Sequence, residues 1–349
     1  MPANRCIHSR FYGFCGVLKA FSKVAPTPVG ANVEEPRRTL ANRISSIPPM
    51  RSLVLTGATL VTCFWVAGCT VTLDSQSQIV REEKRFTVKG VPTVRLTTFD
   101  GTIQIQSWDK PDVLVEIEKR GPTREAVDAL EVKSSQDGDA IDVEVVKPHG
   151  TFGFGVRVVG SARFNVWLPR ESHVKARSGD GSILVEHVKG TIDLHTGDGA
   201  IRLNDVAGEL TLNTGDGSVT ADEVQGRLAV DTGDGAVTIS GDVSGLRIHT
   251  GDGSIIYRGQ AATSMTEDWD ITTGDGAILL YLPQDFSAEL DAHTGDGGIR
   301  NDLNVAAGTQ GEINRRTVRG RIGDGGRQLR IRTGDGAITL KKLQQSSQS

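Results

Sequence analysis

The tripeptide Gly-Asp-Gly recurs nine times in the second half of the chain, and its spacing constrains the fold more than any other feature. The sequence numbers of successive aspartates from Asp180 to Asp252 differ by 18 each time, and the later differences are 23, 21, 28 and 11. Repeats of about this length form units that bury their apolar face against the next repeat. The aspartates are Asp180, Asp198, Asp216, Asp234, Asp252, Asp275, Asp296, Asp324 and Asp335.

Apolar and polar residues alternate on both sides of each Gly-Asp-Gly. This alternation is typical of strands with one buried face, so each period holds two short strands. One corner between them is Gly-Asp-Gly, where we expect Gly to supply a positive φ and Asp to bond its own turn. The other corner is looser and carries Gly190, Gly208, Gly226 or Gly245.

Two architectures fit this pattern. In a β-solenoid each period is one coil, and equivalent residues of successive coils stack about 4.8 Å apart. In an antiparallel meander each Asp-Gly is a hairpin turn, and like turns lie about twice as far apart. Because successive periods are nearly identical, each coil of a solenoid would pack against a copy of itself. We therefore predict an all-β fold with a β-solenoid of about 18-residue coils over residues 171–342, whose core stacks Ile201, Val219, Val237 and Ile255.

The segments around the array are less regular. Residues 85–170 are β-rich and contain one short helix, which we expect over residues 123–130. Residues 69–84 are polar and predict a linker, and residues 343–349 predict a disordered tail. The residues beside Asp324 fit neither strand pattern and predict a loop.

Charge and cysteine content divide the chain near residue 68. Residues 1–68 hold 8 basic and 2 acidic residues, whereas the remainder holds 31 and 41. Because the body after residue 69 has no cysteine, it has no disulfide framework and no Cys-based metal site. A net charge of −4 and 5% aromatic residues argue against a nucleic-acid partner. The four cysteines are Cys6, Cys15, Cys63 and Cys69.

An uncharged apolar run, residues 53–67, follows Arg51. It is shorter than the ~20 residues of a membrane-spanning helix but suits the apolar region of a signal peptide. The run leads into Val66-Ala67-Gly68-Cys69, which resembles the lipobox of bacterial lipoproteins. The resemblance implies cleavage between Gly68 and Cys69 and diacylation of the Cys69 sulfur. We predict a lipoprotein signal peptide over residues 50–68 and interpret residues 1–49, which are long and rich in proline, as an over-extended reading frame.

The body carries short motifs besides the Gly-Asp-Gly units. They are Phe99-Asp100-Gly101-Thr102-Ile103, Trp108-Asp109, Asp112-Val113, Trp167-Leu168-Pro169 and Leu282-Pro283. Together with the serial Thr-Gly-Asp-Gly units, they resemble the adhesin-like β-strand-repeat family of unknown function, also called the Toastrack domain, over roughly residues 85–342. The resemblance implies a right-handed solenoid in a bacterial envelope protein and supplies no catalytic residues.

The row of aspartates is the sharpest chemical feature. In a solenoid the carboxylates would stack about 4.8 Å apart and would need cations or backbone N–H groups to offset their repulsion. One interpretation is a Ca²⁺-binding roll, since Ca²⁺ takes several oxygen ligands. We favour a structural turn column instead, because only one half of each coil has the aspartate. This column comprises Asp180, Asp198, Asp216, Asp234, Asp252, Asp275, Asp296 and Asp335.

Other candidate site residues give weaker patterns. His195, His249 and His293 share one outward position, but several coils separate the first two, too far for one metal ion. We interpret them as exposed polar residues. We also interpret a basic segment, with Arg315, Arg316, Arg319 and Arg321, as a solvated loop. The body has no Ser-His-Asp nucleophile motif, phosphate-binding loop or HExxH motif.

These observations predict a non-enzymatic, lipid-anchored scaffold of the cell envelope. Its partners would be the membrane, through lipid on Cys69, and an envelope protein or a polysaccharide, and we expect no cofactor and no metal. Thr70 after Cys69 favours the outer membrane where the host has one. The alternatives are a polysaccharide-active β-helix enzyme, which needs a cleft with two carboxylates about 5–10 Å apart, and the Ca²⁺-binding roll.

Overall fold

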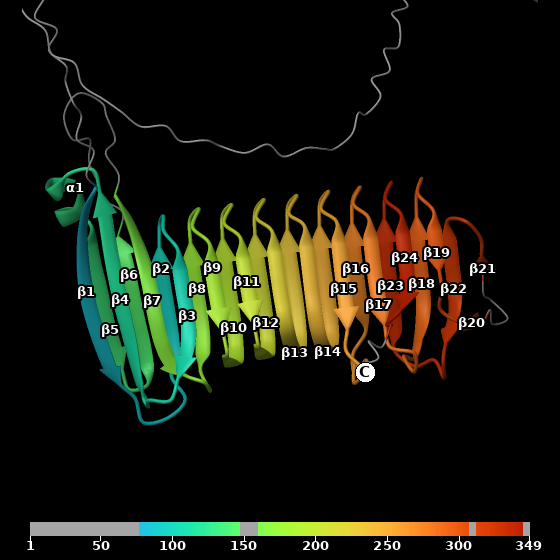
Figure 1. Ribbon diagram of the computed structural model, residues 1–349, viewed down its shortest axis with the longest axis horizontal. Helices are drawn as coiled ribbons and strands as arrows, with labels where there is room; N and C mark the ends of the chain where they lie inside the picture. Colours follow the sequence, from blue (N-terminus) through green and yellow to red (C-terminus); the bar gives the residue numbers. More distant parts are fainter. Residues whose placement is uncertain (1–76, 147–159, 307–311, 345–349) are drawn as a thin grey trace, which may run out of the picture. The chain divides into compact units, whose positions relative to one another are not determined.

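The computed structural model describes residues 77–146, 160–306 and 312–344. Within these ranges strand is the dominant regular structure, with one short helix, and the strands stand side by side in one long row of coils (Figure 1). The predicted extension, signal peptide and lipidated Cys69 lie outside the described residues. In the part of the chain that is described, no helix is long and apolar enough to cross a membrane.

The N-terminal region closes one end of the row with antiparallel strands. β1 pairs antiparallel with β4, β4 with β7, and β5 with β6, whereas β7 lies parallel to β3. The predicted helix is confirmed as α1, where Thr123 Oγ1 accepts a hydrogen bond from Ala126 N at 3.2 Å. The elements are β1 Gln78–Thr87, β2 Thr93–Thr98, β3 Ile103–Trp108, β4 Asp112–Gly121, α1 Arg124–Asp128, β5 Glu131–Asp137, β6 Ala140–Val146 and β7 Ser161–Pro169.

The predicted linker is wrong from Gln78 onward, because β1 occupies that segment. Its charged side chains meet charges of opposite sign on β4. Arg81 Nη2 lies 2.9 Å from Glu118 Oε2, and Lys119 Nζ lies 2.5 Å from Glu82 Oε1. Opposite charges on paired strands stabilise the pairing, so a polar segment forms a strand here.

The repeated units are coils of a solenoid, as predicted. Ile201 pairs with Val219, Val219 with Val237, and Val237 with Ile255, always in parallel. Parallel pairing one period apart excludes the antiparallel meander for this array. β13 and β14 each run through the looser corner without a break. The elements are β8 His173–Ser178, β9 Ile183–Glu186, β10 Lys189–Thr196, β11 Ile201–Asn204, β12 Ala207–Thr214, β13 Val219–Thr232, β14 Val237–Thr250, β15 Ile255–Gly259, β16 Trp269–Thr273 and β17 Ile278–Leu282.

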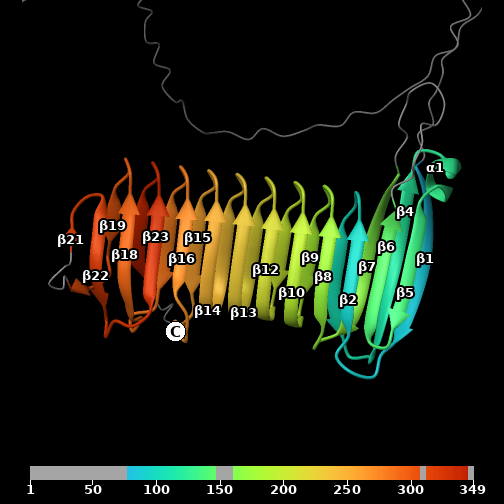
Figure 2. The same cartoon turned by 180° about the vertical axis from the view of Figure 1, so that it is seen from behind.

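After β17 the spatial order of the coils departs from the sequence order. The coil β23–β24 lies between β16–β17 and β18–β19, with all neighbours parallel (Figure 2). The segment containing Asp324 is a loop from β22 to β23, as predicted, with positive φ at Gly323, Gly325 and Gly326. The elements are β18 Ala288–Thr294, β19 Ile299–Asn301, β20 Val305–Ala306, β21 Glu312–Ile313, β22 Thr317–Ile322, β23 Gln328–Thr333 and β24 Ile338–Lys342.

Two parallel sheets enclose the core. We call the strands that lead into the corners the entry sheet (β2, β8, β10, β12, the second halves of β13 and β14, β16, β23 and β18). We call the strands that leave the corners the exit sheet (β3, β9, β11, the first halves of β13 and β14, β15, β17, β24 and β19). Apolar rows from both sheets are buried between them, and Trp269, which is 1% exposed, packs edge-on against Tyr257 with ring centroids 5.1 Å apart.

Candidate functional site

Threonine hydroxyls join each corner to the corner beside it. Thr214 Oγ1 donates to the carbonyl oxygens of Gly197 and Gly199, at 3.3 and 2.9 Å, in the preceding coil. The hydroxyl is buried. It supplies the donor to Gly199 O and adds a second donor to Gly197 O, which already accepts a hydrogen bond from Gly215 N. The same pair of bonds is made by Thr196, Thr232, Thr250, Thr273, Thr333 and Thr294.

Close stacking explains the corner glycines, and the expectation of positive φ there is wrong for the array. A Cβ added at Gly199 would lie 2.2 Å from the carbonyl oxygen of Gly181, and one added at Gly217 would lie 2.1 Å from that of Gly199. No side chain fits between backbones that approach so closely. Within the array, positive φ occurs at the looser corner instead, where Gly190, Gly208 and Gly226 have φ of 155°, 127° and 102°. A second positive-φ position recurs three residues earlier, at His187, Asp205 and Glu223, and Gly241 continues it in the next coil, whereas the expected Gly245 does not have positive φ.

The predicted aspartate column is present as an exposed edge. All eight aspartates are exposed, and Asp198 Oδ1 lies 3.0 Å from the place of a Cβ on Gly215 in the next coil. Within the described ranges, the carboxylates of the column residues Asp180, Asp198, Asp216, Asp234 and Asp252 accept no hydrogen bond, so the expected bond of each aspartate to its own turn is not found there. Threonine and glycine, rather than aspartate, hold the corner.

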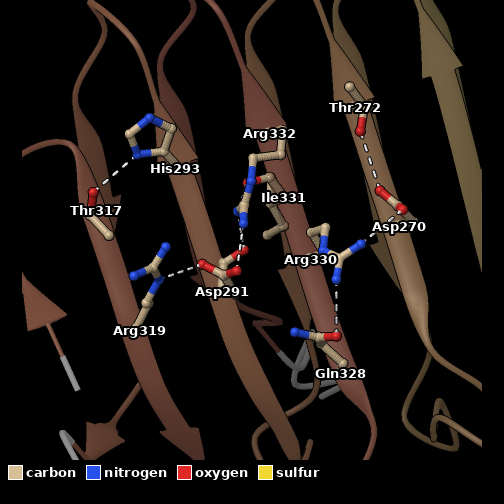
Figure 3. Close-up of polar contacts among 10 residues, drawn as sticks. All are labelled: Asp270, Thr272, Asp291, His293, Thr317, Arg319, Gln328, Arg330, Ile331 and Arg332. Atoms are coloured by element: carbon tan, nitrogen blue, oxygen red, sulfur yellow. Dashed lines mark hydrogen bonds and ion pairs between the residues drawn. The ribbon is translucent and has the colours of Figure 1, made fainter. Parts of the chain in front are cut away.

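The described residues contain no group of three or more His, Cys, Asp or Glu side chains that could hold a metal ion. His195, His249 and His293 are exposed, as predicted. The imidazole Nδ1 of His293 lies 3.0 Å from Thr317 Oγ1 (Figure 3). These histidines therefore sit on separate strands as outward polar residues.

The basic segment faces acidic residues instead of forming an open anion site. Arg319 and Arg321 are part of β22, not of a loop, and lie 2.9 Å from Asp291 and 3.3 Å from Glu289. Arg332 Nη2 contacts the other oxygen of Asp291 at 2.5 Å, so this carboxylate lies between two arginines (Figure 3). Partial burial would raise the pKa of Asp291, but its hydrogen bonds to Arg332 and Arg319 outweigh burial and lower the pKa.

A groove on the outer face of the exit sheet escaped the sequence analysis. It has a volume of about 350 Å³ and spans β9, β3, β7 and β4. Strand register sets its side chains in two rows. One row runs through Glu116, Asn165, Gln104 and Leu184, and the other through Trp167, Gln106 and Glu186.

Only the fold brings these residues together. β3 ends at Trp108 and β7 begins only at Ser161, yet the two strands lie side by side. The alternation in Ile103–Trp108 indicates that Gln104 and Gln106 face outward, but nothing in the sequence places Trp167 beside them. The pairing of β7 with β3 therefore had to be seen before this site could be recognised.

Comparisons with known proteins identify the fold family. A family model described as Toastrack DUF4097 matches residues 92–341. No protein of curated function matches the chain in sequence.

Three solved structures are similar over 76% of this chain. They are a proposed cell adhesion protein from Clostridium sporogenes (13% identity, 100% of its chain, TM-score 0.26), a proposed lipid-binding protein from Parabacteroides distasonis (14%, 97%, 0.46) and a proposed adhesin from Bacteroides fragilis (11%, 97%, 0.34).

Proposed function

This chain belongs to the Toastrack DUF4097 family, and we propose that it acts as a lipid-anchored binding scaffold of the bacterial cell envelope, without catalysis. The observation that carries the proposal is the parallel register of successive coils, which repeats without a gap from β8–β9 to β18–β19. Such register fixes outward side chains at intervals of about 4.8 Å on a rigid surface. A surface of this kind suits an extended partner.

Support for the anchor comes from the sequence of the leader. Val66-Ala67-Gly68-Cys69 follows an apolar run of signal-peptide length. The first strand begins at Gln78, so lipid on Cys69 would hold the solenoid within about 30 Å of the membrane even if the intervening chain were fully extended. The scaffold would then lie close enough to the membrane to bind other components of the cell envelope.

The arrangement of carboxylates favours binding over sugar-bond hydrolysis. Hydrolases of glycosidic bonds place two carboxyl groups about 5–10 Å apart. In the exit-sheet groove, Glu116 and Glu186 stand on strands separated by three strand spacings, about 14 Å between backbones. Glu116 also contacts Arg81 at 3.8 Å, and Arg81 stands on β1, on the side of β4 away from Glu186. This arrangement supports a binding role for the groove.

Membrane fractionation tests the anchor. The full chain with Cys69→Ser should leave the membrane fraction and appear in the soluble fraction, because stable membrane anchoring requires the acyl chains that this sulfur would carry. Cys63→Ser is the matched control, since Cys63 lies inside the apolar run and its replacement should leave fractionation unchanged. Retention of the Cys69→Ser variant at the wild-type level would contradict the anchor.

A further inference from the structure

We propose that the exit-sheet groove binds a neutral chain of pyranose sugars. This inference rests on the proposed scaffold function, because it names the class of partner that the scaffold holds. The groove is defined by Gln104, Gln106, Glu116, Asn165, Trp167, Leu184 and Glu186.

The polar groups of the groove are free to bind a ligand. Among the described residues, the side chains of Gln104, Gln106, Asn165 and Glu186 have no hydrogen-bond partner. An amide offers both donors and acceptors, and a carboxylate offers acceptors, so together they match sugar hydroxyls, which also donate and accept. Elsewhere on the exposed faces many polar side chains are paired, as Lys175 is with Asp193.

An aromatic surface completes the groove. Trp167 lines it and is partly buried, with its ring 6.5 Å from that of Trp108. Trp108 is itself fixed, because its Nε1 donates to Asp112 O at 2.8 Å and Lys110 lies over its ring at 4.7 Å. The indole of Trp167 offers a surface for the apolar C–H face of a pyranose ring, while its edge can still donate a hydrogen bond.

Charge argues for a neutral ligand. Of the described residues, the charged side chains that line the groove are Glu116 and Glu186 alone, and Glu116 lies 3.8 Å from Arg81. No lysine or arginine belongs to this lining, and among the described residues Glu186 has no cationic partner, so phosphates, nucleic acids and acidic glycans would meet repulsion from Glu186. A purely apolar ligand is also disfavoured, because it would leave the amides unpaired.

The strand register favours a chain over a single sugar. The row through Trp167, Gln106 and Glu186 continues onto β11 with the neutral Asn204, whereas Arg202 follows Leu184 in the other row, outside the groove lining. Each step crosses one strand spacing of about 4.8 Å, close to the length of one sugar unit in an extended glycan. Consecutive units would thus contact consecutive strands.

Titration calorimetry of the full chain with three neutral hexasaccharides, cellohexaose, chitohexaose and mannohexaose, tests the proposal. At least one should bind, and hexagalacturonate should bind at least tenfold more weakly. Gln104→Ala combined with Gln106→Ala should weaken binding about tenfold or more, since both side chains are exposed and their loss should not disturb folding. Trp167→Ala should weaken it further, and Trp167→Phe should restore part of the affinity.

Asn213→Ala combined with Thr211→Ala is the matched control, because both residues face outward on the entry strand β12, outside the groove. This variant should bind as the wild type does. The proposal is overturned if none of the three neutral hexasaccharides binds, if only hexagalacturonate binds, or if the glutamine variant binds as tightly as the control. Membrane fractionation of Cys69→Ser reads out the anchor separately, so failure of sugar binding leaves the anchor standing.

Discussion

The coils from Asp180 to Asp252 and the coils after Asp252 have the same type of corner, but the chain links them in a different order. In the first group each coil pairs with the coil one period away, whereas β23 pairs with β16 across all the chain from β17 to β22. The contacts are nevertheless the same. Thr333 Oγ1 donates to the carbonyl oxygens of Gly274 and Gly276 at 3.2 and 2.9 Å, as Thr214 does to glycines one period away. Coil stacking therefore depends on the corner and not on the length of chain between corners.

The two ends of the row differ from its middle in a second way. Antiparallel strands cover the ends, with β1 on β4 at one and β22 on β18 at the other. β1 carries five consecutive charged residues, Arg81 to Arg85. Charges on an edge strand discourage pairing with another chain. The middle needs no such protection, because both edges of every coil are occupied.

The largest expected effect comes from a side chain at a stacked corner. Gly217→Ala should lower the free energy of unfolding by about 3 kcal/mol or more, because its Cβ would lie 2.1 Å from the backbone oxygen of Gly199. Gly298→Ala, at the C-terminal end, is the control, since its Cβ would meet only Arg315 atoms at 3.7 Å or beyond. Urea denaturation compares the two. Equal losses in the free energy of unfolding of the two variants would show that close stacking is not the reason for glycine at the corners.

A smaller effect should follow from removing one corner hydroxyl. Thr214→Val keeps the shape but leaves Gly199 O without its donor and Gly197 O with the backbone donor alone, and should cost about 1–2 kcal/mol. Thr98→Val, in the first coil, should cost less, because Thr98 Oγ1 makes only long contacts of 3.4 Å. Thermal melts of both variants test this order. A larger loss of stability in Thr98→Val than in Thr214→Val would contradict the stronger corner bonding expected in the middle of the row.

These contrasts show which parts of the fold the sequence could predict. The array was predictable because each coil meets a near-copy of itself, so the pairing of Ile201 with Val219 follows from the period alone. The place of β23–β24 was not, because it depends on contacts between residues as distant in sequence as Trp269 and Leu329. The sequence indicated where the aspartates lie, but the hydrogen bonds expected between each carboxylate and its own turn are not found among the described residues. The sequence repeats aspartate most visibly, whereas threonine and glycine make the contacts.

The exit-sheet groove could not be predicted for a related reason. Its residues come from four strands. Of these, only β3 and β9 each follow an Asp-Gly corner and pair in parallel, as strands of successive repeats do. β7 reaches β3 from outside the array and brings Asn165 and Trp167 with it. Irregular pairing at the N-terminal end thus creates the site, whereas regular pairing in the middle creates the surface beside it.

The ion pairs at the C-terminal end predict a modest effect that depends on pH. Asp291→Asn should lower the free energy of unfolding by about 1 kcal/mol at neutral pH. The pKa of Asp291 is lowered in the folded state, so this stabilisation is full above the ordinary carboxyl pKa near 4 and is lost as pH falls through the folded pKa. Urea denaturation at pH 7 and at pH 3 should show the difference from wild type shrinking.

Asp270→Asn is the matched control for that series. Asp270 is more exposed and lies 3.7 Å from Arg330. Its replacement should therefore cost at most about half of the loss in Asp291→Asn at neutral pH, because exposed ion pairs contribute little to stability. A pH-independent loss in Asp291→Asn, or an equal loss in both variants, would contradict a charge effect at Asp291.

The smallest effect is expected in the aspartate column. Asp216→Ala should change the free energy of unfolding by no more than about 0.5 kcal/mol, because the carboxylate is exposed and accepts no hydrogen bond in the described structure. Thermal melts with EDTA and with millimolar Ca²⁺ should agree within a few degrees. A rise of about ten degrees or more with Ca²⁺ would make the column a metal site.

Disulfide trapping tests the order of the coils most directly, in a chain whose four native cysteines are replaced by serine. Asp275→Cys with Asp335→Cys should cross-link under mild oxidation, because these corners are neighbours about 4.8 Å apart. Asp275→Cys with Asp296→Cys should not, because a whole coil separates those corners. Cross-linking of the second pair and not the first would show coils stacked in sequence order and would contradict the account.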